Sequence, residues 1–542
     1  MGALRERPTV TYEECHEDGC VILRNGFHSA QQEQVVEEWV EELHGESEDS
    51  SDASTIASVD GDQSSLLDMM SAVKVLLDGL GEDITRDGLL KTPLRVAQAF
   101  QGATKGYRQA AKDVVGGALF MEPGAGGSNG SGGGCGGMVV VRNVELFALC
   151  EACLLPFRIR CHIAYVPVGE RVVGLSKLPR VAELFAKKLQ NPHRFAKEVA
   201  VSLTEALQPE PLGVAVLVES WHLQWPGAKE NGAVADLEKC VGWVPLTAFA
   251  GTGQFEDKNH DLWEELVALL QLEGHSVANR CSLDVAAENS NSSGCPFALH
   301  DAMPSQNGYS PLPLQTCNGC SGLEIVGNGV HKVAFDCSVP ALPAMVAAVE
   351  TLLRSIGENP NRKELQLTSS RFVQWLLTST QGSRVGTPGN VDLLSGLQRL
   401  RFTGDASDLP EEIISSEFNF PFCSQCEHHL LPFVGVVHVG YLARRGRGRK
   451  QHLDRESVQR VVRGYSLRLQ VQERLTREIA EAIGGSVMVV VEASHMCMLS
   501  RGVQQVDSLT STYASLGLFS SNSKLRTSFL QLVAKKTQGR LT

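Results

Sequence analysis

The chain lacks an excess of basic residues. Its 49 Lys and Arg are outnumbered by 62 Asp and Glu, which gives a net charge of -13. Surfaces that bind nucleic acid or anionic membranes need clustered positive charge, so this balance argues against both classes of partner. An anionic ligand would have to meet a local cluster of Lys and Arg.

Long apolar runs are also missing. No run approaches the roughly 18 residues of a membrane-spanning helix. No apolar signal core stands near the start, and residues 13–62 are rich in Asp and Glu, whereas transit peptides are poor in acids. Glu6 stands where a myristoylation signal needs Ser or Thr. We therefore expect a soluble, cytoplasmic protein with an acidic disordered start, residues 1–61, whose 15 cysteines stay reduced.

A long internal repeat organises the remaining chain. Leu76-Leu-Asp-Gly-Leu-Gly-Glu-Asp recurs as Leu352-Leu-Arg-Ser-Ile-Gly-Glu-Asn, 276 positions later. The same offset carries Cys150-Glu-Ala-Cys-Leu-Leu-Pro-Phe onto Cys426-Glu-His-His-Leu-Leu-Pro-Phe. Matches this long and in constant order indicate a duplicated domain rather than short solenoid units. We expect a first module over residues 62–273 and a second module over residues 336–542.

The segment between the modules, residues 274–335, is rich in Ser, Asn, Gly and Pro and has no periodicity, as expected of a flexible linker. Its cysteines are Cys281, Cys295, Cys317 and Cys320. They raise the alternative of a metal clip. We prefer the linker, because no histidine or further cysteine pair completes a tetrahedral set at ordinary spacing.

Within each module the pattern runs from helices to strands, then to a helix and further strands. In the first module we expect a helix over residues 66–80, a hairpin over 159–168 and 172–175, helical structure over 182–207 and a buried strand over 213–219. Strands and helices that do not strictly alternate predict an α+β fold with antiparallel sheets.

Cysteine and histidine gather at two predicted strand ends of the second module. Cys426-Glu-His428-His429 follows one strand, and His495-Met-Cys497 follows another. Two cysteines and a histidine suit zinc and leave a fourth position open, which is the catalytic arrangement. The alternative is a set of core cysteines and hydrogen-bonded histidines. Four such residues in two tight clusters favour the metal.

These motifs, with Leu469-Gln-Val-Gln-Glu-Arg-Leu-Thr and Ser500-Arg-Gly-Val-Gln, resemble GTP cyclohydrolase I, and the tandem arrangement resembles its plant-type form. The resemblance implies tunnelling-fold (T-fold) modules whose sheets join into a barrel in a homo-oligomer, with sites at interfaces between modules. It implies a zinc enzyme that converts GTP into 7,8-dihydroneopterin triphosphate and formate, the first step of pterin and tetrahydrofolate biosynthesis.

The resemblance also assigns site residues in the second module. Zinc would be held by Cys426, His429 and Cys497, and protons would be carried by His428 and His495. The guanine edge would be held by Gln472 and Glu473, and the nucleotide would be contacted by Arg501. Zinc lowers the pKa of bound water to about 7, an imidazole protonates the base, and a carboxylate selects guanine over adenine.

Each module lacks part of this set. The first keeps the phosphate segment Gly174-Leu-Ser176-Lys177-Leu-Pro-Arg180, for which the second has Asp454-Arg-Glu-Ser-Val-Gln-Arg. We expect Lys177 and Arg180 to contact the triphosphate and Ser176 to act, with His428, in the ribose steps.

The first module keeps Cys150, Cys153 and His222, but Gln224 stands where the second module has Cys497. We therefore expect zinc in the second module only. Both modules keep an arginine at one matching position, Arg95 in the first and Arg371 in the second, and these two residues are candidate phosphate contacts. This division predicts a site shared between unlike modules.

Two other functions stay open from the sequence. One is a pseudoenzyme that binds GTP without turnover, against which the intact zinc set argues. The other is a related tunnelling-fold enzyme that acts on a pterin or a queuosine precursor. The combination of Gln472-Glu473 and Ser176-Lys177 with the zinc set argues against it.

Overall fold

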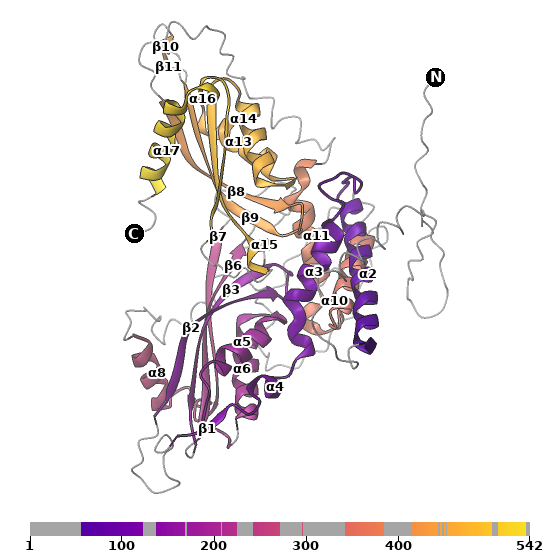
Figure 1. Ribbon diagram of the computed structural model, residues 1–542, viewed down its shortest axis with the longest axis vertical. Coiled ribbons are helices and arrows are strands. Elements are labelled where there is room, and N and C mark those ends of the chain that lie inside the picture. Colours follow the sequence, from indigo (N-terminus) through magenta and orange to yellow (C-terminus); the bar gives the residue numbers. More distant parts are fainter. Residues whose placement is uncertain are drawn as a thin grey trace, which may run out of the picture. The chain divides into compact units, whose positions relative to one another are not determined.

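The structure, a computed structural model, is drawn in Figure 1. It describes residues 56–122, 137–168, 171–207, 209–224, 242–271, 295, 342–383, 414–442, 445–446, 449–450, 453–500 and 508–537. Residues 1–55 of the expected acidic start, most of the expected linker and Arg501 lie outside the described residues. Residues 56–61, which were expected to be disordered, are helical because they form the first turns of α2. No helix in the described ranges is long and apolar enough to cross a membrane.

A five-stranded sheet forms the centre of the first module (Figure 1). Its strands, in order across the sheet, are β5 (Leu189–Gln190), β2 (Val139–Cys150), β3 (Pro156–Val166), β6 (Gly213–Gln224) and β7 (Gly242–Gly253). All neighbours are antiparallel except β5 and β2, which are parallel. One face is covered by α5 (Lys177–Ala186) and α6 (Pro192–Ala206), and the other by α8 (Asp261–Gln271).

The second module repeats this sheet. The order is β12 (Leu469–Gln470), β8 (Ile414–Cys426), β9 (Pro432–Leu442), β13 (Val487–His495) and β14 (Thr510–Ser515), with the same strand directions. One face packs on α13 (Arg455–Ser466) and α14 (Gln472–Ile483), and the other on α16 (Leu518–Ser521) and α17 (Ser523–Thr537). Two antiparallel sheets covered by helices confirm the predicted α+β class and the two tandem tunnelling-fold modules.

The duplication extends to irregular backbone. A bulge interrupts the pairing of β2 with β3 and of β8 with β9, at Asn143 (φ 55°) and at Asn419 (φ 60°). Leu154 (φ 59°) and Leu430 (φ 50°) lie in the turns that follow β2 and β8. A leucine at positive φ is strained by about 1 to 3 kcal/mol, so tertiary contacts must hold both turns in place.

Two pairs of helices precede the sheets: α2 (Ile56–Gly79) with α3 (Thr92–Thr104), and α10 (Leu342–Ser355) with α11 (Thr368–Ser379). The Ser65 hydroxyl donates to the Ser355 carbonyl at 2.8 Å. A Cβ atom on Gly79 would lie 2.5 Å from Met345 Cγ, so α2 and α10 are in close contact.

The shorter elements are η1 (Lys105–Arg108), α4 (Ala111–Val115), β1 (Leu119–Met121), β4 (Arg171–Val173), η3 (Lys363–Leu365), η4 (Gln381–Ser383), β10 (Arg445–Gly446), β11 (Arg449–Lys450) and α15 (Met496–Ser500).

One local expectation was wrong. The strand β4 pairs with β1 instead of forming a hairpin with β3, because both edges of β3 are already occupied by β2 and β6. The helical structure expected over 182–207 is present as two helices, the end of α5 and all of α6, with a break between them. There the Asn191 side chain caps α6 by accepting from the Arg194 N–H at 2.9 Å, and Pro192 opens the helix. The helix over 66–80 and the strand over 213–219 are confirmed, within α2 and β6.

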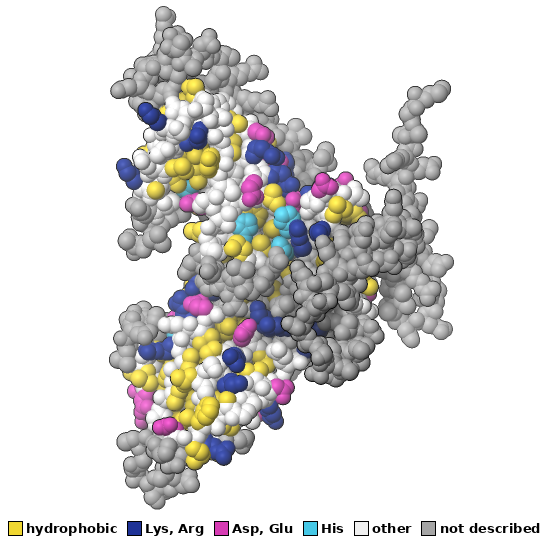
Figure 2. Space-filling model, in the orientation of Figure 1, with side chains coloured by type: hydrophobic (Ala, Val, Ile, Leu, Met, Phe, Trp, Pro, Cys, Tyr) yellow, Lys and Arg dark blue, Asp and Glu magenta, His cyan; other side chains and the backbone are white. Residues whose placement is uncertain are grey.

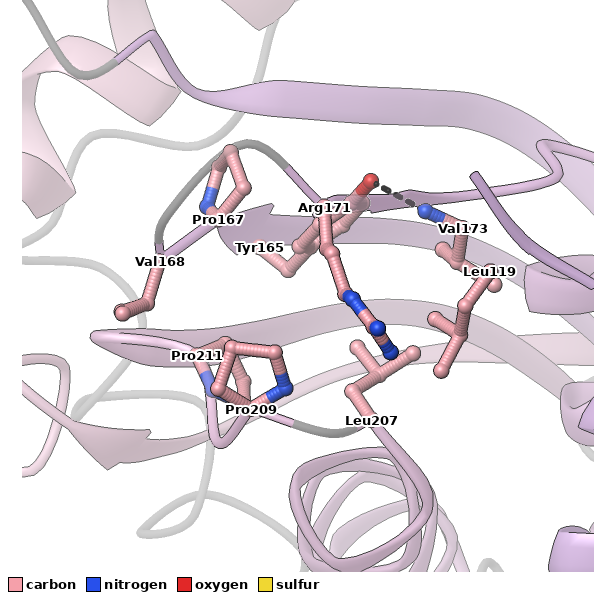
Figure 3. A pocket seen from close by; sticks show the side chains of 9 residues that line it. All are labelled: Leu119, Tyr165, Pro167, Val168, Arg171, Val173, Leu207, Pro209 and Pro211. Atoms are coloured by element: carbon pink, nitrogen blue, oxygen red, sulfur yellow. Dashed lines mark hydrogen bonds between the residues drawn. The ribbon is translucent and has the colours of Figure 1, made fainter. Parts of the chain in front are cut away.

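A small pocket lies beside β4, shown in Figure 3. Its lining consists of Leu119, Tyr165, Pro167, Val168, Arg171, Val173, Leu207, Pro209 and Pro211. The Val173 N–H donates to Tyr165 Oη at 3.1 Å. None of the predicted site residues lines this pocket. Its contacts hold β4, and therefore the start of α5, against the sheet.

Candidate metal and nucleotide site

The three predicted zinc ligands of the second module lie together. Cys426 ends β8, His429 lies in the turn that follows, and Cys497 lies in the first turn of α15, directly after β13. The ligand atoms of these residues all lie within 4.8 Å of one another. They meet because β13 pairs with β9 up to the contact of His495 with Phe433, next to the turn that carries His429.

The environment of Cys426 favours a thiolate. The hydrogen bond with Cys497, assisted by His429, lowers the pKa of the Cys426 thiol to about 4, although burial raises it. The thiolate is the form of cysteine that binds metals. Two cysteines and one imidazole at this separation fit zinc with one position open.

His495 is fixed beside these ligands. Its ring stacks on Phe433, with centroids 4.6 Å apart and planes 4° apart, and its Nε2 lies 2.7 Å from Gln472 Oε1. Because an amide oxygen only accepts, Nε2 carries the proton. Burial lowers the pKa of His495, which keeps the ring neutral near pH 7.

The structure places Gln472 behind His495. Its side chain is buried, and Nε2 donates to Val491 O at 3.1 Å and to Thr510 O at 2.8 Å. With the amide held in this way, Gln472 orients His495. The contact of Gln472 with the guanine edge, which the resemblance implies, stays a prediction.

Glu473 and His428 reach the surface. Glu473 is exposed in the first turn of α14. Burial lowers the pKa of the neighbouring His495, and the charge of Glu473 opposes this shift in part. The His428 side chain is 37% exposed, with Nε2 3.9 Å from Glu427 Oε1. Figure 2 shows histidine side chains at the surface of this part of the molecule, beside basic side chains. Both residues are therefore accessible to a ligand.

Glu427 is a site residue that the sequence motifs did not predict. Its buried carboxylate accepts from Arg474 and from Arg86, each at 2.6 Å, and its carbonyl accepts from Thr92 Oγ1 at 2.8 Å. Arg86 and Thr92 belong to the first module. Burial raises the pKa of Glu427, but the two arginines outweigh this effect and hold it below its usual value. The sequence did contain a signal for this role, because a glutamate stands between two candidate metal ligands at the matching position of both modules.

The same contact occurs in reverse. Glu151, at the matching position of the first module, accepts from Arg194 at 2.9 Å and from Arg362 at 3.0 Å, and its carbonyl accepts from Thr368. Arg362 and Thr368 belong to the second module. Each module therefore covers the cysteine turn of the other, in the reciprocal manner of a two-fold interface.

This exchange positions Arg95 and Arg371. Arg95 lies on α3, which contacts α15 of the second module. Arg371 lies on α11, and its charge acts on Cys295. Arg95 is thus on the helix beside the second-module cluster, and Arg371 is beside the first-module cysteines.

The phosphate segment lies elsewhere. Ser176 and Arg180 are exposed at the start of α5, and Lys177 Nζ donates to Val114 O at 2.8 Å. These residues follow β4, whose partner β1 is at one end of the first-module sheet, whereas α15 is at the other end (Figure 1). The described part of one chain does not bring Lys177 to the second-module cluster.

The structure corrects one premise about the first module. Cys150, Cys153 and His222 are joined by Cys295, with all four ligand atoms within 4.8 Å of one another. The preference for a plain linker rested on ordinary sequence spacing, which does not account for Cys295, because this residue approaches the first-module cysteines through space.

The Glu427 contacts predict a stability change. Glu427→Gln should lower the free energy of unfolding by about 1 to 3 kcal/mol near pH 7, because two arginines lose a buried ionic acceptor. Since the folded pKa of Glu427 is lowered, its contribution is present above its unfolded value and is lost as the pH falls through the folded value. Denaturant unfolding at neutral and acid pH measures both effects, and the difference should shrink in acid.

The matched control is Glu481→Gln, which removes an exposed pair with Arg477 on α14. This substitution should change the free energy of unfolding by less than about 0.5 kcal/mol. Equal effects of the two substitutions would contradict the role given to Glu427.

Comparisons with known proteins agree with this geometry. Residues 69–235 and 345–534 each match the family GTP cyclohydrolase I. GTP cyclohydrolase 1 of Solanum lycopersicum is 43% identical over 481 residues, which cover 86% of this chain and 92% of that protein. GTP cyclohydrolase 1 of Arabidopsis thaliana is 38% identical over 87% of this chain and 91% of that protein. GTP cyclohydrolase 1 of Neurospora crassa is 46% identical over 29% of this chain and 45% of that protein. Since the family matches both modules and two relatives align over nearly their full length, this chain belongs to the GTP cyclohydrolase I family.

Proposed function

We propose that this chain hydrolyses GTP to 7,8-dihydroneopterin triphosphate and formate, the first step of pterin and tetrahydrofolate biosynthesis. The observation that carries the proposal is the convergence of Cys426, His429 and Cys497, with His495 fixed beside them. A GTP-binding pseudoenzyme would have no use for this set. Family membership of both modules supports the same reaction.

The donor set fits zinc. Two sulfur atoms and one imidazole nitrogen within 4.8 Å match its preferred ligands, and Cys426 is held as a thiolate. Bound there, zinc would supply a strong nucleophile at neutral pH for attack on C8 of the purine.

The histidines would move protons. His495 is neutral and carries its proton on Nε2, so its Nδ1 has the lone pair that accepts a proton. His428, whose side chain is partly exposed beside the cluster, would donate a proton to N7 of the base as the imidazole ring of GTP opens. Ser176 of the phosphate segment would assist, with His428, in the later ribose steps.

We infer that the phosphate contacts come from a second chain. Lys177 and Arg180 follow β4, whose partner β1 lies at the other end of the first-module sheet from α15, so a second chain of a homo-oligomer would bring them to the cluster. Arg95, on the helix beside α15, and Arg501 complete the proposed cationic set. In a chain of net charge -13, such a local cluster is what a triphosphate requires.

Incubation of the purified chain with GTP tests the reaction. We expect formate release in equal amount to a product with the mass of dihydroneopterin triphosphate. Binding of GTP without formate release would favour the pseudoenzyme, and a different substrate or product would favour a related tunnelling-fold enzyme.

The cytoplasmic location belongs to the proposal and is tested by imaging the full chain with a C-terminal fluorescent tag.

Guanine recognition yields a sharper prediction. Glu473→Ala should lower kcat/KM for GTP by about 30-fold to 1000-fold, equivalent to about 2 to 4 kcal/mol, because guanine N–H groups would lose their acceptor. The zinc content should stay unchanged. For inosine triphosphate, which lacks the 2-amino group, the same substitution should lower kcat/KM by a smaller factor than it does for GTP. The control is Glu481→Ala on the same helix, and an unchanged kcat/KM for Glu473→Ala would make Glu473 a surface charge.

A further inference from the structure

Three side chains of the first module and one from the segment between the modules, all of types that bind metals, converge outside the site described above. Cys150 ends β2, Cys153 lies in the following turn, His222 lies near the end of β6, and Cys295 comes from the segment between the modules. The first three are 0% exposed and Cys295 is 7% exposed. We propose that these four residues form a second metal centre, a closed Cys3His zinc site that ties Cys295 to the first module.

The distances fit a tetrahedral ion. Zinc bonds of about 2.3 Å to sulfur and 2.0 Å to nitrogen place two sulfur atoms about 3.8 Å apart and sulfur and nitrogen about 3.5 Å apart. Here Cys150 Sγ and Cys295 Sγ are 3.8 Å apart, and Cys153 Sγ is 3.3 Å from His222 Nε2. A disulfide would require a sulfur separation near 2.05 Å. The four atoms are therefore spaced as ligands.

The imidazole is oriented as a ligand. His222 Nδ1 lies 2.7 Å from the Leu223 carbonyl, which only accepts, so Nδ1 carries the proton. Its Nε2 therefore presents a lone pair towards Cys153. A metal-bound histidine commonly donates its other ring N–H to a carbonyl in this way, which fixes the tautomer.

The two modules differ here for a specific reason. His222 matches His495, whose Nε2 is held by Gln472. Pro192 stands at the position of Gln472 in the first module and has no side-chain amide, so His222 turns its Nε2 to the cysteines instead. Cys295 then takes the place that Cys497 fills in the second module.

Three thiolates and one zinc ion would carry a net charge of -1, which a buried site must offset. Burial raises the pKa of the Cys150 and Cys153 thiols in the metal-free chain, so these two thiolates would form when the metal binds. The charge of Arg371, on α11 of the second module, acts on Cys295. With four protein ligands and no open position, this centre would be structural, unlike the three-ligand cluster of Cys426. It would hold the cysteine turn on which Thr368 of the second module docks.

Metal analysis of the purified full chain tests the proposal without reference to GTP turnover. We expect two zinc ions per wild-type chain, one in Cys295→Ser, one in Cys497→Ser and none in the double variant. The matched control, Cys161→Ser, removes a buried cysteine of β3 that is outside the cluster and should keep both ions. One zinc per wild-type chain, or two in Cys295→Ser, would overturn the proposal.

X-ray absorption of the Cys497→Ser chain tests the ligands even if Cys295→Ser fails to fold, because the first-module cluster is intact in this variant. The remaining zinc should have three sulfur neighbours at about 2.3 Å and one nitrogen at about 2.0 Å. Two or fewer sulfur neighbours, or absence of zinc from this chain, would overturn the assignment.

Discussion

Cys497→Ala should remove the second-module metal and reduce formate release from GTP by on the order of 1000-fold or more, about 4 kcal/mol of activation free energy. Cys497 is one of only three ligands that the described residues bring to this cluster, so no fourth side chain there can replace it. Zinc analysis and a formate assay on the same sample measure both effects. Because Cys497 also lowers the pKa of Cys426, its loss weakens the thiolate that remains.

The matched control is Cys423→Ala. Cys423 is a buried cysteine of β8, three residues before Cys426, and is not part of the cluster. The Cys423→Ala chain should keep its zinc and its rate of formate release, although a buried thiol is lost. If Cys497→Ala kept normal formate release, the zinc reaction would have to be abandoned, whatever the metal content of the first module.

The second large effect concerns the phosphate segment. Lys177→Ala should lower kcat/KM for GTP by about 10-fold to 150-fold, equivalent to about 1.5 to 3 kcal/mol, because a charged contact with the triphosphate is lost. The zinc content should not change. Arg171→Ala is the control, since it removes an exposed cation near β4 that lines the small pocket of Figure 3.

Mixing the variants distinguishes the two possible interfaces. If each site takes zinc ligands from one chain and Lys177 from another, Lys177→Ala and Cys497→Ala chains that are unfolded and reassembled together should regain activity. At equal amounts with random assortment, about a quarter of the sites would combine both intact parts. No recovery would place each site within one chain.

Truncation addresses the shared site itself. Residues 336–542 alone should turn over GTP far more slowly than the whole chain, because they lack both the phosphate segment and the Arg86 contact to Glu427. Equal kcat/KM for the truncated and whole chains would leave Lys177 and Arg180 without a role in the reaction.

Several features could be predicted because they depend on local sequence. The cluster of Cys426, His429 and Cys497 was predictable, since its members lie at or shortly after the ends of β8 and β13, and both of these ends lie beside the start of β9. Which strands pair with one another was harder to predict. The hairpin expected for residues 159–175 failed because strand pairing is decided by which sheet edges are already occupied.

The roles of neighbouring residues were harder to assign. Gln472 and Glu473 are adjacent, and sequence resemblance gave both to guanine. In α14 adjacent side chains point in different directions, so Gln472 is buried behind His495 while Glu473 is exposed. The guanine contact of Glu473 stays a prediction.

The sequence by itself determined the duplication and the α+β class, and it predicted the second-module cluster of Cys426, His429 and Cys497, because an ordered repeat and short motif spacings are properties of the covalent chain. Only the tertiary structure decided which distant groups meet. Arg86 reaches Glu427 across 341 positions, and Cys295 reaches Cys150 across 145. No periodicity or motif spacing encodes such contacts, since they arise when two folded modules pack and when Cys295 meets a buried cysteine turn.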